Sequence, residues 1–337
     1  MSIVGLDIGG ANLKAAHIDG ECLSEPFPLW QHPEQLSAKL AELVSRLPTS
    51  KTLAVTMTGE LADCYISKTE GVLAILDAVE EMVEGRSIHV WNTAGEFVDV
   101  EVAREFPILV AAANWHALAT WVGKLTPEGN ALLVDIGTTT TDVIPLEDGF
   151  PVPLGRTDLE RLQTGELEYT GSRRTILCSL AHTVPVGRNR CLVSSELFAT
   201  THDIYLWLGD THEDASDTST ADGRPATREA TRDRLCRLIC ADRHEVTDDD
   251  LTNVCLFLKD VQKKRITGSI DRVRGRMVGD CDQVILSGSG SFLAEEIFSQ
   301  HAKFSSATLQ SLSSIVSPAA AESACAVALT RLAEERL

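Results

Sequence analysis

Residues 132–142 read Leu-Leu-Val-Asp-Ile-Gly-Thr-Thr-Thr-Thr-Asp, and residues 4–14 read Val-Gly-Leu-Asp-Ile-Gly-Gly-Ala-Asn-Leu-Lys. Each stretch has an apolar run, an Asp-Ile-Gly corner, a short tip of small residues and a return run. Such a pattern predicts a tight hairpin whose acid ends the first strand. Because the two copies lie far apart in the chain, they indicate two related halves.

These corners have the composition of an anion site. A glycine directly after a strand lets backbone N–H groups approach a ligand closely, and a concave row of such groups binds phosphate. The acids Asp7 and Asp135 would repel phosphate unless a divalent cation lies between them, and Mg²⁺ prefers a few carboxylates together with phosphate oxygens. We therefore expect Asp7 and Asp135 to be metal ligands.

A third glycine-rich corner, at residues 287–291, follows an apolar run and opens a helix, which adds further N–H donors. Taken singly, either Asp-Ile-Gly corner is better explained as an ordinary turn, but two copies followed by the third corner favour an anion site. The residues expected to bind phosphate or nucleotide are Gly9, Gly10, Ala11, Asn12, Gly137, Thr138, Thr139, Thr140, Gly288, Ser289 and Gly290. A dinucleotide fingerprint and a P-loop are excluded, because Leu293 replaces the third glycine and no Lys-Ser or Lys-Thr pair follows Gly10.

The rest of the chain alternates apolar runs with helix-period patterns, which indicates an α/β fold. Strands are expected at 3–8, 52–57, 131–136 and 283–287, and helices at 111–122 and 318–336. Apolar residues at 197, 204, 205 and 208 predict one helix of a mostly helical second half. The aperiodic stretch 209–228 predicts a long loop.

Composition limits the classes of partner. The 337 residues include 30 Lys and Arg against 49 Asp and Glu, a net charge of −19, which argues against nonspecific binding of nucleic acid or anionic membranes. No apolar run is long enough to cross a bilayer, and the N-terminus does not resemble a signal peptide. Nine cysteines without a C-x-x-C pair suit a reducing compartment. We expect a cytoplasmic protein with small-molecule substrates.

The three corners resemble the phosphate-1, phosphate-2 and adenosine motifs of the actin, sugar kinase and heat-shock chaperone ATPase superfamily. The resemblance implies two ribonuclease-H-like domains closing on a cleft. The first would comprise residues 1–128 joined by the C-terminal helix 318–337, and the second residues 129–317. It also implies Mg²⁺, while leaving open whether ATP is bound.

Within that superfamily the chain resembles hydantoinase/oxoprolinase-related proteins linked to tetrahydromethanopterin-dependent C1 transfer and methanofuran biosynthesis. The segments that carry this resemblance are 4–14, 55–63, 112–115, 135–142, 168–175, 196–209 and 220–223. The resemblance implies a transferase in which the phenol of γ-glutamyl-tyramine displaces pyrophosphate from an aminomethyl-furanmethyl diphosphate, forming an aryl ether.

That reaction assigns roles to particular side chains. A phenol with a pKa of about 10 needs a base near neutrality, and the candidates are Glu60, Asp63 and Asp222, whose order is open. Lys14 would stabilise the departing pyrophosphate. Arg174 suits a phosphate or the glutamyl carboxylate. Asn114 is equally well explained as a satisfied buried amide or as a substrate contact.

Other functions fit the same corners. An ATP-dependent amidohydrolase of the hydantoinase or oxoprolinase type would phosphorylate a ring amide, although enzymes with that activity are much longer. A small-molecule kinase needs a base beside an acceptor hydroxyl, and a nucleotide-switched binding protein needs a partner surface, to which no apolar segment points. A homo-oligomer is compatible with the sequence.

Overall fold

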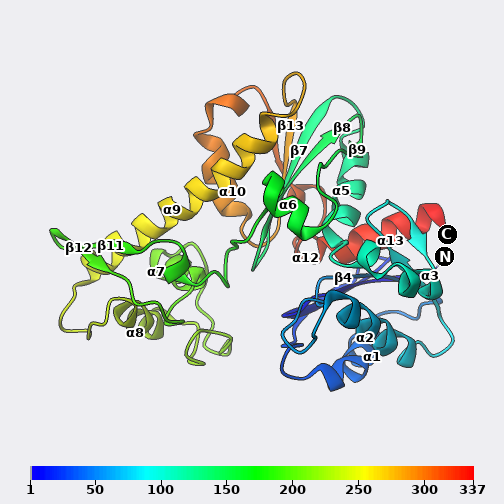
Figure 1. Cartoon of the computed structure of the whole chain (residues 1–337), viewed down its shortest axis with the longest axis horizontal. Coiled ribbons are helices and arrows are strands. Elements are labelled where there is room, and N and C mark those ends of the chain that lie inside the picture. Colours follow the sequence, from blue (N-terminus) through cyan, green and yellow to red (C-terminus); the bar gives the residue numbers. More distant parts are fainter. Residues whose placement is uncertain (1) are drawn as a thin grey trace.

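The computed structural model describes residues 2–337, which contain two large sheets with the same strand order (Figure 1). In each sheet an antiparallel hairpin lies beside two strands that run parallel to its first strand. The first sheet has the order β3-β2-β1-β4-β5-β6, with β1 Ile3–Ile8, β2 Asn12–His17, β3 Cys22–Pro26, β4 Thr52–Met57, β5 Ser87–Trp91 and β6 Phe97–Val98. This repetition confirms an α/β fold built from two related domains.

The second sheet has the order β10-β8-β7-β13-β14, and β9 also pairs with β8. Its strands are β7 Asn130–Ile136, β8 Thr141–Glu147, β9 Phe150–Pro151, β10 Leu167–Glu168, β13 Gln283–Ser287 and β14 Thr308–Ser311. Strand β1 is buried throughout and β7 nearly so, as continuous apolar runs require when helices cover both faces of a sheet.

Two helices lie between the sheets and share one apolar core with both (Figure 1). Helix α13 (Ala324–Arg336) packs against β1, β2 and β4, whereas α5 (Asn114–Leu125) packs against β7, β8 and β9. The two helices also contact each other, and alanines of both, such as Ala117 and Ala326, belong to the shared core. The predicted helix 111–122 thus begins at Asn114, and the predicted helix 318–336 is divided at Ser323.

Outer helices complete both domains. Helices α1 (Leu36–Ser45) and α2 (Lys68–Glu81) pack on the first sheet, and the Ser67 side chain caps α2 by accepting a hydrogen bond from the N–H of Glu70. The remaining short helices are α3 Val100–Glu105, α4 Pro107–Val110, α6 Asp158–Thr164, α10 Ser291–Ser299, α11 Leu312–Ile315 and α12 Pro318–Glu322, with single 3₁₀ turns at Pro33–Gln35, Leu177–Ser179 and Ala302–Phe304.

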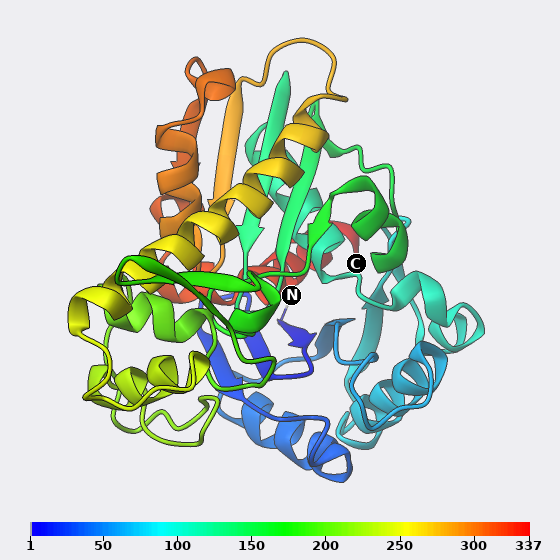
Figure 2. The same cartoon turned by 60° about the vertical axis from the view of Figure 1, so that its left-hand side comes forward.

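The second domain carries a lobe inserted between β10 and β13, which projects to one side in both views (Figures 1 and 2). It contains the hairpin β11 (Thr183–Val186) and β12 (Asn189–Leu192), helices α7 (Thr201–Leu208) and α8 (Arg228–Leu238), and the 27-residue α9 (Asp248–Arg274). The predicted loop 209–228 is confirmed, because no helix or strand forms between α7 and α8. The domain boundary at residue 128 remains a prediction.

None of the helices in residues 2–337 combines the length and the apolarity needed to span a membrane.

Candidate active site

The two hairpin corners have the same local geometry. The N–H of Gly9 donates to the carbonyl of Asn12 at 3.0 Å, and the N–H of Gly137 donates to that of Thr140 at 2.9 Å. Strand register pairs Asp7 with Lys14 in one hairpin and Asp135 with Asp142 in the other. The predicted tips, residues 9–12 and 137–140, are therefore equivalent turns that follow equivalent acids.

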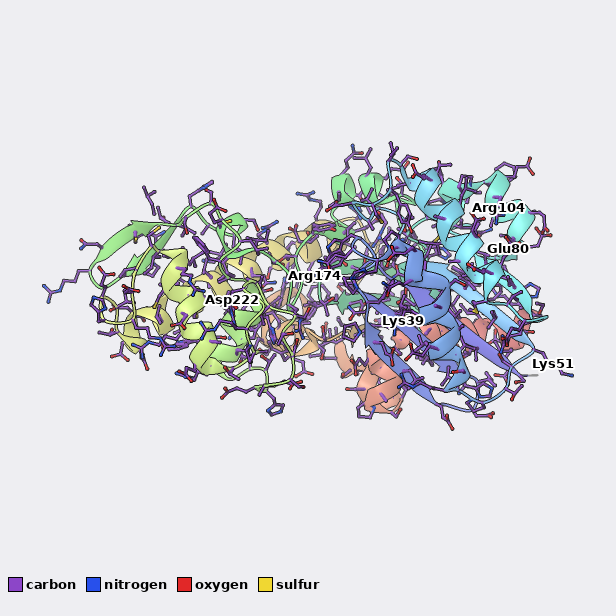
Figure 3. The ribbon with its side chains drawn as sticks, turned by 90° about the horizontal axis from the view of Figure 1, so that it is seen from below. Lys39, Lys51, Glu80, Arg104, Arg174 and Asp222 are labelled. Atoms are coloured by element: carbon purple, nitrogen blue, oxygen red, sulfur yellow. The ribbon has the colours of Figure 1, made fainter. Side chains whose placement is uncertain are left out.

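A contact between the domains brings the two turns together. The N–H of Leu29 donates to the carbonyl of Gly10 at 3.0 Å, which holds Trp30 beside the first turn. The N–H of Arg174 donates to the carbonyl of Thr138 at 2.9 Å, which holds Arg174 beside the second. The Arg174 guanidinium carbon lies 5.0 Å from the centre of the Trp30 ring, and Figure 3 shows Arg174 at the junction between the lobe and the first domain.

The third corner lies against the second turn. The N–H of Gly290 donates to the carbonyl of Ile136 at 2.8 Å, and the Ser289 hydroxyl lies 2.8 Å from that of Ser172. Gly288 has a φ of +85°, and a side chain there would approach Asp135 Oδ1 to 2.6 Å. Glycine is required at position 288 because both the backbone conformation and the space exclude a Cβ. The structure thus brings Gly288, Ser289 and Gly290 to Asp135.

The acids of the two corners influence each other's charge. Burial raises the pKa of Asp7, and Lys14 opposes this shift. Burial also raises the pKa of Asp135 to about 6, with Asp142 and then Asp7 adding to the shift. Oδ1 of Asp7 is buried without a hydrogen-bond partner among residues 2–337. An unpartnered carboxylate oxygen close to a second acid fits a divalent cation, so these residues suit Mg²⁺.

Lys14 lies on β2 opposite Asp7, where its Nζ donates to the carbonyl of Glu322 at 2.8 Å. Lys14 also lowers the pKa of Asp135, the acid of the other domain. Its charge therefore lies within reach of both corners.

Glu60 is the most deeply buried of the three carboxylates considered as a base, with 1% of its surface exposed. Burial raises the pKa of Glu60 to about 7; the charge of Asp158 adds to the shift, and that of Lys68 opposes it. Its Oε2 has no hydrogen-bond partner among residues 2–337. A carboxyl that changes protonation near neutrality and keeps a free oxygen is suited to accept a proton.

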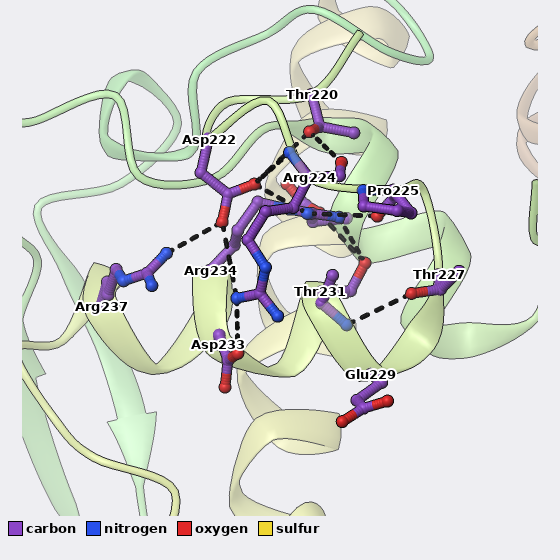
Figure 4. Close-up of polar contacts among 12 residues, drawn as sticks. Thr220, Asp222, Arg224, Pro225, Thr227, Glu229, Thr231, Asp233, Arg234 and Arg237 are labelled. Atoms are coloured by element: carbon purple, nitrogen blue, oxygen red, sulfur yellow. Dashed lines mark hydrogen bonds and ion pairs between the residues drawn. The ribbon is translucent and has the colours of Figure 1, made fainter. Parts of the chain in front are cut away.

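The other two candidate bases are placed differently. Asp63 is exposed in the turn that precedes α2. Asp222 lies in the inserted lobe, where Arg234 Nη1 and Arg237 Nη1 contact its oxygens at 3.1 and 2.9 Å (Figure 4). Burial acts to raise the pKa of Asp222, but hydrogen bonds from the N–H of Arg224 and from both side chains outweigh it and hold the pKa below its usual range. We therefore retain Glu60 alone as the candidate base.

Asn114 begins α5, and its Oδ1 lies 2.7 Å from the N–H of Trp115. The guanidinium of Arg161 stacks 4.0 Å from the Trp115 ring and pairs with Asp142. Asn114 itself is half-buried, and its role as a substrate contact stays a prediction.

Two residues of this region were not predicted. Trp30 has no sequence motif, and its role emerges only from its contact with Arg174 across the domains. Gln262 of α9 is fully buried and donates from Nε2 to Thr170 Oγ1 at 2.9 Å and to the Gly171 carbonyl at 2.8 Å. Gly171 packs on the second turn so closely that a side chain would lie 2.5 Å from the N–H nitrogen of Thr139.

A cavity of about 240 Å³ lies elsewhere, between the β2–β3 connection and α12–α13. It is lined by His17, Cys22 and Arg331 among others, and by no predicted site residue.

Comparisons with known proteins agree with the fold. The hydantoinase/oxoprolinase family model matches residues 51–336. Over all of this chain and 99% of the other, the structure is similar to one titled PilM-PilN type IV pilus biogenesis complex, with a TM-score of 0.52 and 12% identity. That likeness shows a shared fold and nothing about function.

Two curated relatives share one name, (4-{4-[2-(γ-L-glutamylamino)ethyl]phenoxymethyl}furan-2-yl)methanamine synthase. The protein of Methanocaldococcus jannaschii is 34% identical over 302 residues, 89% of each chain. The protein of Methanococcus vannielii is 32% identical over 174 residues, 52% of this chain and 77% of the other. The family match and the identity across most of the chain show that this protein belongs to the hydantoinase/oxoprolinase family.

Proposed function

We propose that this protein is a transferase of methanofuran-type cofactor biosynthesis that joins the phenol of γ-glutamyl-tyramine to an aminomethyl-furanmethyl diphosphate. The phenol oxygen forms a bond to the furanmethyl carbon, the bond from that carbon to the diphosphate oxygen breaks, and pyrophosphate leaves. The observation that carries the proposal is the 34% identity over 89% of both chains to a synthase whose name describes such a phenoxymethyl-furan product.

The paired turns suit the diphosphate. The N–H groups of Gly9, Gly137 and Gly290 donate to backbone carbonyls and shape the corners. The N–H groups of residues 10–12 and 138–140 would face the diphosphate oxygens, and the third corner would add those of Gly288 and Ser289. Asp7 and Asp135 would hold Mg²⁺, which when bound offsets the negative charge of pyrophosphate. Lys14, near both acids, would stabilise the charge that develops on the leaving group.

Glu60 would accept the phenol proton. Its pKa of about 7 leaves a large share ionised at neutral pH, and its free Oε2 can take the proton as the ether bond forms. Arg174 and Asn114 are the proposed substrate contacts.

Incubation with Mg²⁺, the furan diphosphate and γ-glutamyl-tyramine tests the proposal. Mass spectrometry should detect the ether, with an equal amount of released pyrophosphate. Asp7→Asn and Asp135→Asn should each lower turnover by orders of magnitude while circular dichroism stays unchanged. Near-native activity in either variant would contradict the metal assignment.

The family match also favours testing an ATP-dependent amidohydrolase. ATP hydrolysis that depends on a cyclic amide, with no ether formed, would replace the transferase proposal, and ATP-dependent phosphorylation of an alcohol would indicate a kinase.

A further inference from the structure

Arg174 differs from most arginines of this acidic chain in lacking a carboxylate partner. Its neighbour Arg173 pairs with Asp217, and buried Arg161 and Arg234 pair with Asp142 and Asp203. Within residues 2–337 no carboxylate lies within ion-pair distance of Arg174, although its side chain is exposed beside the second turn. An exposed guanidinium at a substrate site, in a chain with a net charge of −19, is available for an external anion.

The orientation of Arg174 is set by the other domain. Its guanidinium carbon stacks 5.0 Å from the centre of the Trp30 ring. A guanidinium stacked on an aromatic face keeps its in-plane N–H donors free, and those donors match a carboxylate with two parallel hydrogen bonds. Trp30 thus orients the Arg174 guanidinium without occupying its N–H donors.

Arg174 also differs from the proposed pyrophosphate ligands in the contacts that hold it. The backbone donors of both turns already face the diphosphate in the proposed arrangement, with Asp7, Asp135 and Lys14 at its centre. Arg174 and Trp30 instead lie on segments hydrogen-bonded to the turn carbonyls of Thr138 and Gly10, and the Arg174 guanidinium lies over the Trp30 ring.

From these observations we infer that Trp30 and Arg174 form a specificity site for the acceptor, in which Arg174 binds the carboxylate of the glutamyl group and Trp30 positions the guanidinium. This inference rests on the proposed function and names the part of the acceptor that the protein recognises. The expected selectivity is for phenols that carry a carboxylate on a short amide-linked arm.

Binding of three phenols, measured by calorimetry without the diphosphate, tests the site. γ-Glutamyl-tyramine and N-glutaryl-tyramine carry the carboxylate, whereas N-acetyl-tyramine keeps the phenol and the amide but lacks it. The wild-type protein should prefer the first two by about 10- to 100-fold, as expected for charge-assisted bidentate pairing. Arg174→Gln should abolish that preference and leave the affinity for N-acetyl-tyramine unchanged.

Variants of Trp30 test whether its aromatic ring positions the Arg174 guanidinium, because they leave the charge of Arg174 unchanged. Trp30→Phe should retain the preference because it keeps an aromatic face, and Trp30→Ala should reduce it. Trp30 is the only tryptophan of the five that is not buried, so its fluorescence should respond when an acceptor carboxylate binds to Arg174. Arg188→Gln, which removes an exposed arginine from the β11–β12 turn, is the matched control and should bind like wild type.

Two results would overturn the inference. One is an unchanged preference in Arg174→Gln, and the other is weaker binding of inorganic pyrophosphate with Mg²⁺ in that variant, which would make Arg174 a phosphate ligand. Because these measurements need no turnover, they stay separate from the proposed function, whose failure would show as absence of the ether in the wild-type protein.

Discussion

The burial of Glu60 affects both the pH dependence of the proposed reaction and the pH dependence of stability. Burial raises its pKa to about 7, whereas an unfolded glutamate has a pKa of about 4.3. The folded protein therefore binds a proton more tightly than the unfolded chain does, and the resulting loss of stability develops as pH rises from about 4.3 through about 7.

Glu60→Gln should lower turnover by about 10²- to 10⁴-fold, because the proton acceptor is lost. In the wild-type protein, the rate at saturating Mg²⁺ should rise through a midpoint near pH 7, and the variant should lack this rise. Thermal unfolding should show the variant gaining stability relative to wild type at pH 8 but not at pH 4. An unchanged pH–rate profile in Glu60→Gln would remove Glu60 from the mechanism.

Gly288→Ala should destabilise the protein by about 1–3 kcal/mol and lower turnover, because it combines a φ of +85° with a close approach to Asp135 Oδ1. Gly209→Ala is the matched control, since Gly209 has a φ of +82° but open space where a Cβ would lie. Thermal unfolding and activity of the two variants distinguish the backbone strain that both share from the steric clash with Asp135, which only Gly288→Ala introduces. Equal loss of activity in both would contradict a specific role for the corner at Asp135.

Strands and helices differ in how much of them could be predicted from the sequence. Strands Ile3–Ile8, Thr52–Met57 and Gln283–Ser287 have the predicted bounds, because strands covered on both faces are continuous apolar runs. Leu197 was expected on a helix, but it is exposed and lies before α7. That helix begins at Thr201, because Thr200 caps its N-terminus. Edge strands such as β10 and β14 lack such runs and were not predicted.

The residues of the candidate site also differ in how far they could be predicted from the sequence. Residues whose roles depend on local turn chemistry, such as Gly137 and Gly288, could be proposed from the sequence because glycine marks the corner. Trp30 could not, since its role depends on a residue 144 positions away in the other domain. The low pKa of Asp222 likewise depends on arginines of α8 that a one-dimensional pattern does not place.

Helix α9 reaches the second turn through Gln262, which also accepts a hydrogen bond from the Tyr205 hydroxyl of α7. Gln262→Leu leaves these buried groups unpaired and should cost about 1–3 kcal/mol in unfolding free energy. Because Gly171 packs on the turn, the variant should also raise KM for the diphosphate. Thr252→Val, which removes the α9 acceptor for Trp207 Nε1, should lower stability without changing KM. If the KM of Gln262→Leu for the diphosphate were unchanged, the Gln262 hydrogen bonds would contribute to stability but not to substrate binding.

The arrangement of the two domains places charges from both beside Glu60. Lys68 of α2 and Asp158 of α6 form an ion pair of 3.0 Å between the domains. The pair is partly exposed, so its loss should change stability by only about 0.2–1 kcal/mol.

Asp158→Asn should lower the midpoint of the pH–rate profile, because Asp158 raises the pKa of Glu60. Lys68→Met should raise that midpoint, because Lys68 lowers the same pKa. Initial rates across pH 5–9 measure both shifts. Shifts in the same direction, or none, would show that the second domain does not approach Glu60 as the structure describes.

The contact of α5 with α13 has a consequence for how the molecule unfolds. One of three apolar clusters includes residues of both sheets, whereas the other two belong to one domain each, so separating the halves would expose the shared cluster. Because this shared cluster couples the two halves, heating should melt them together in one cooperative step.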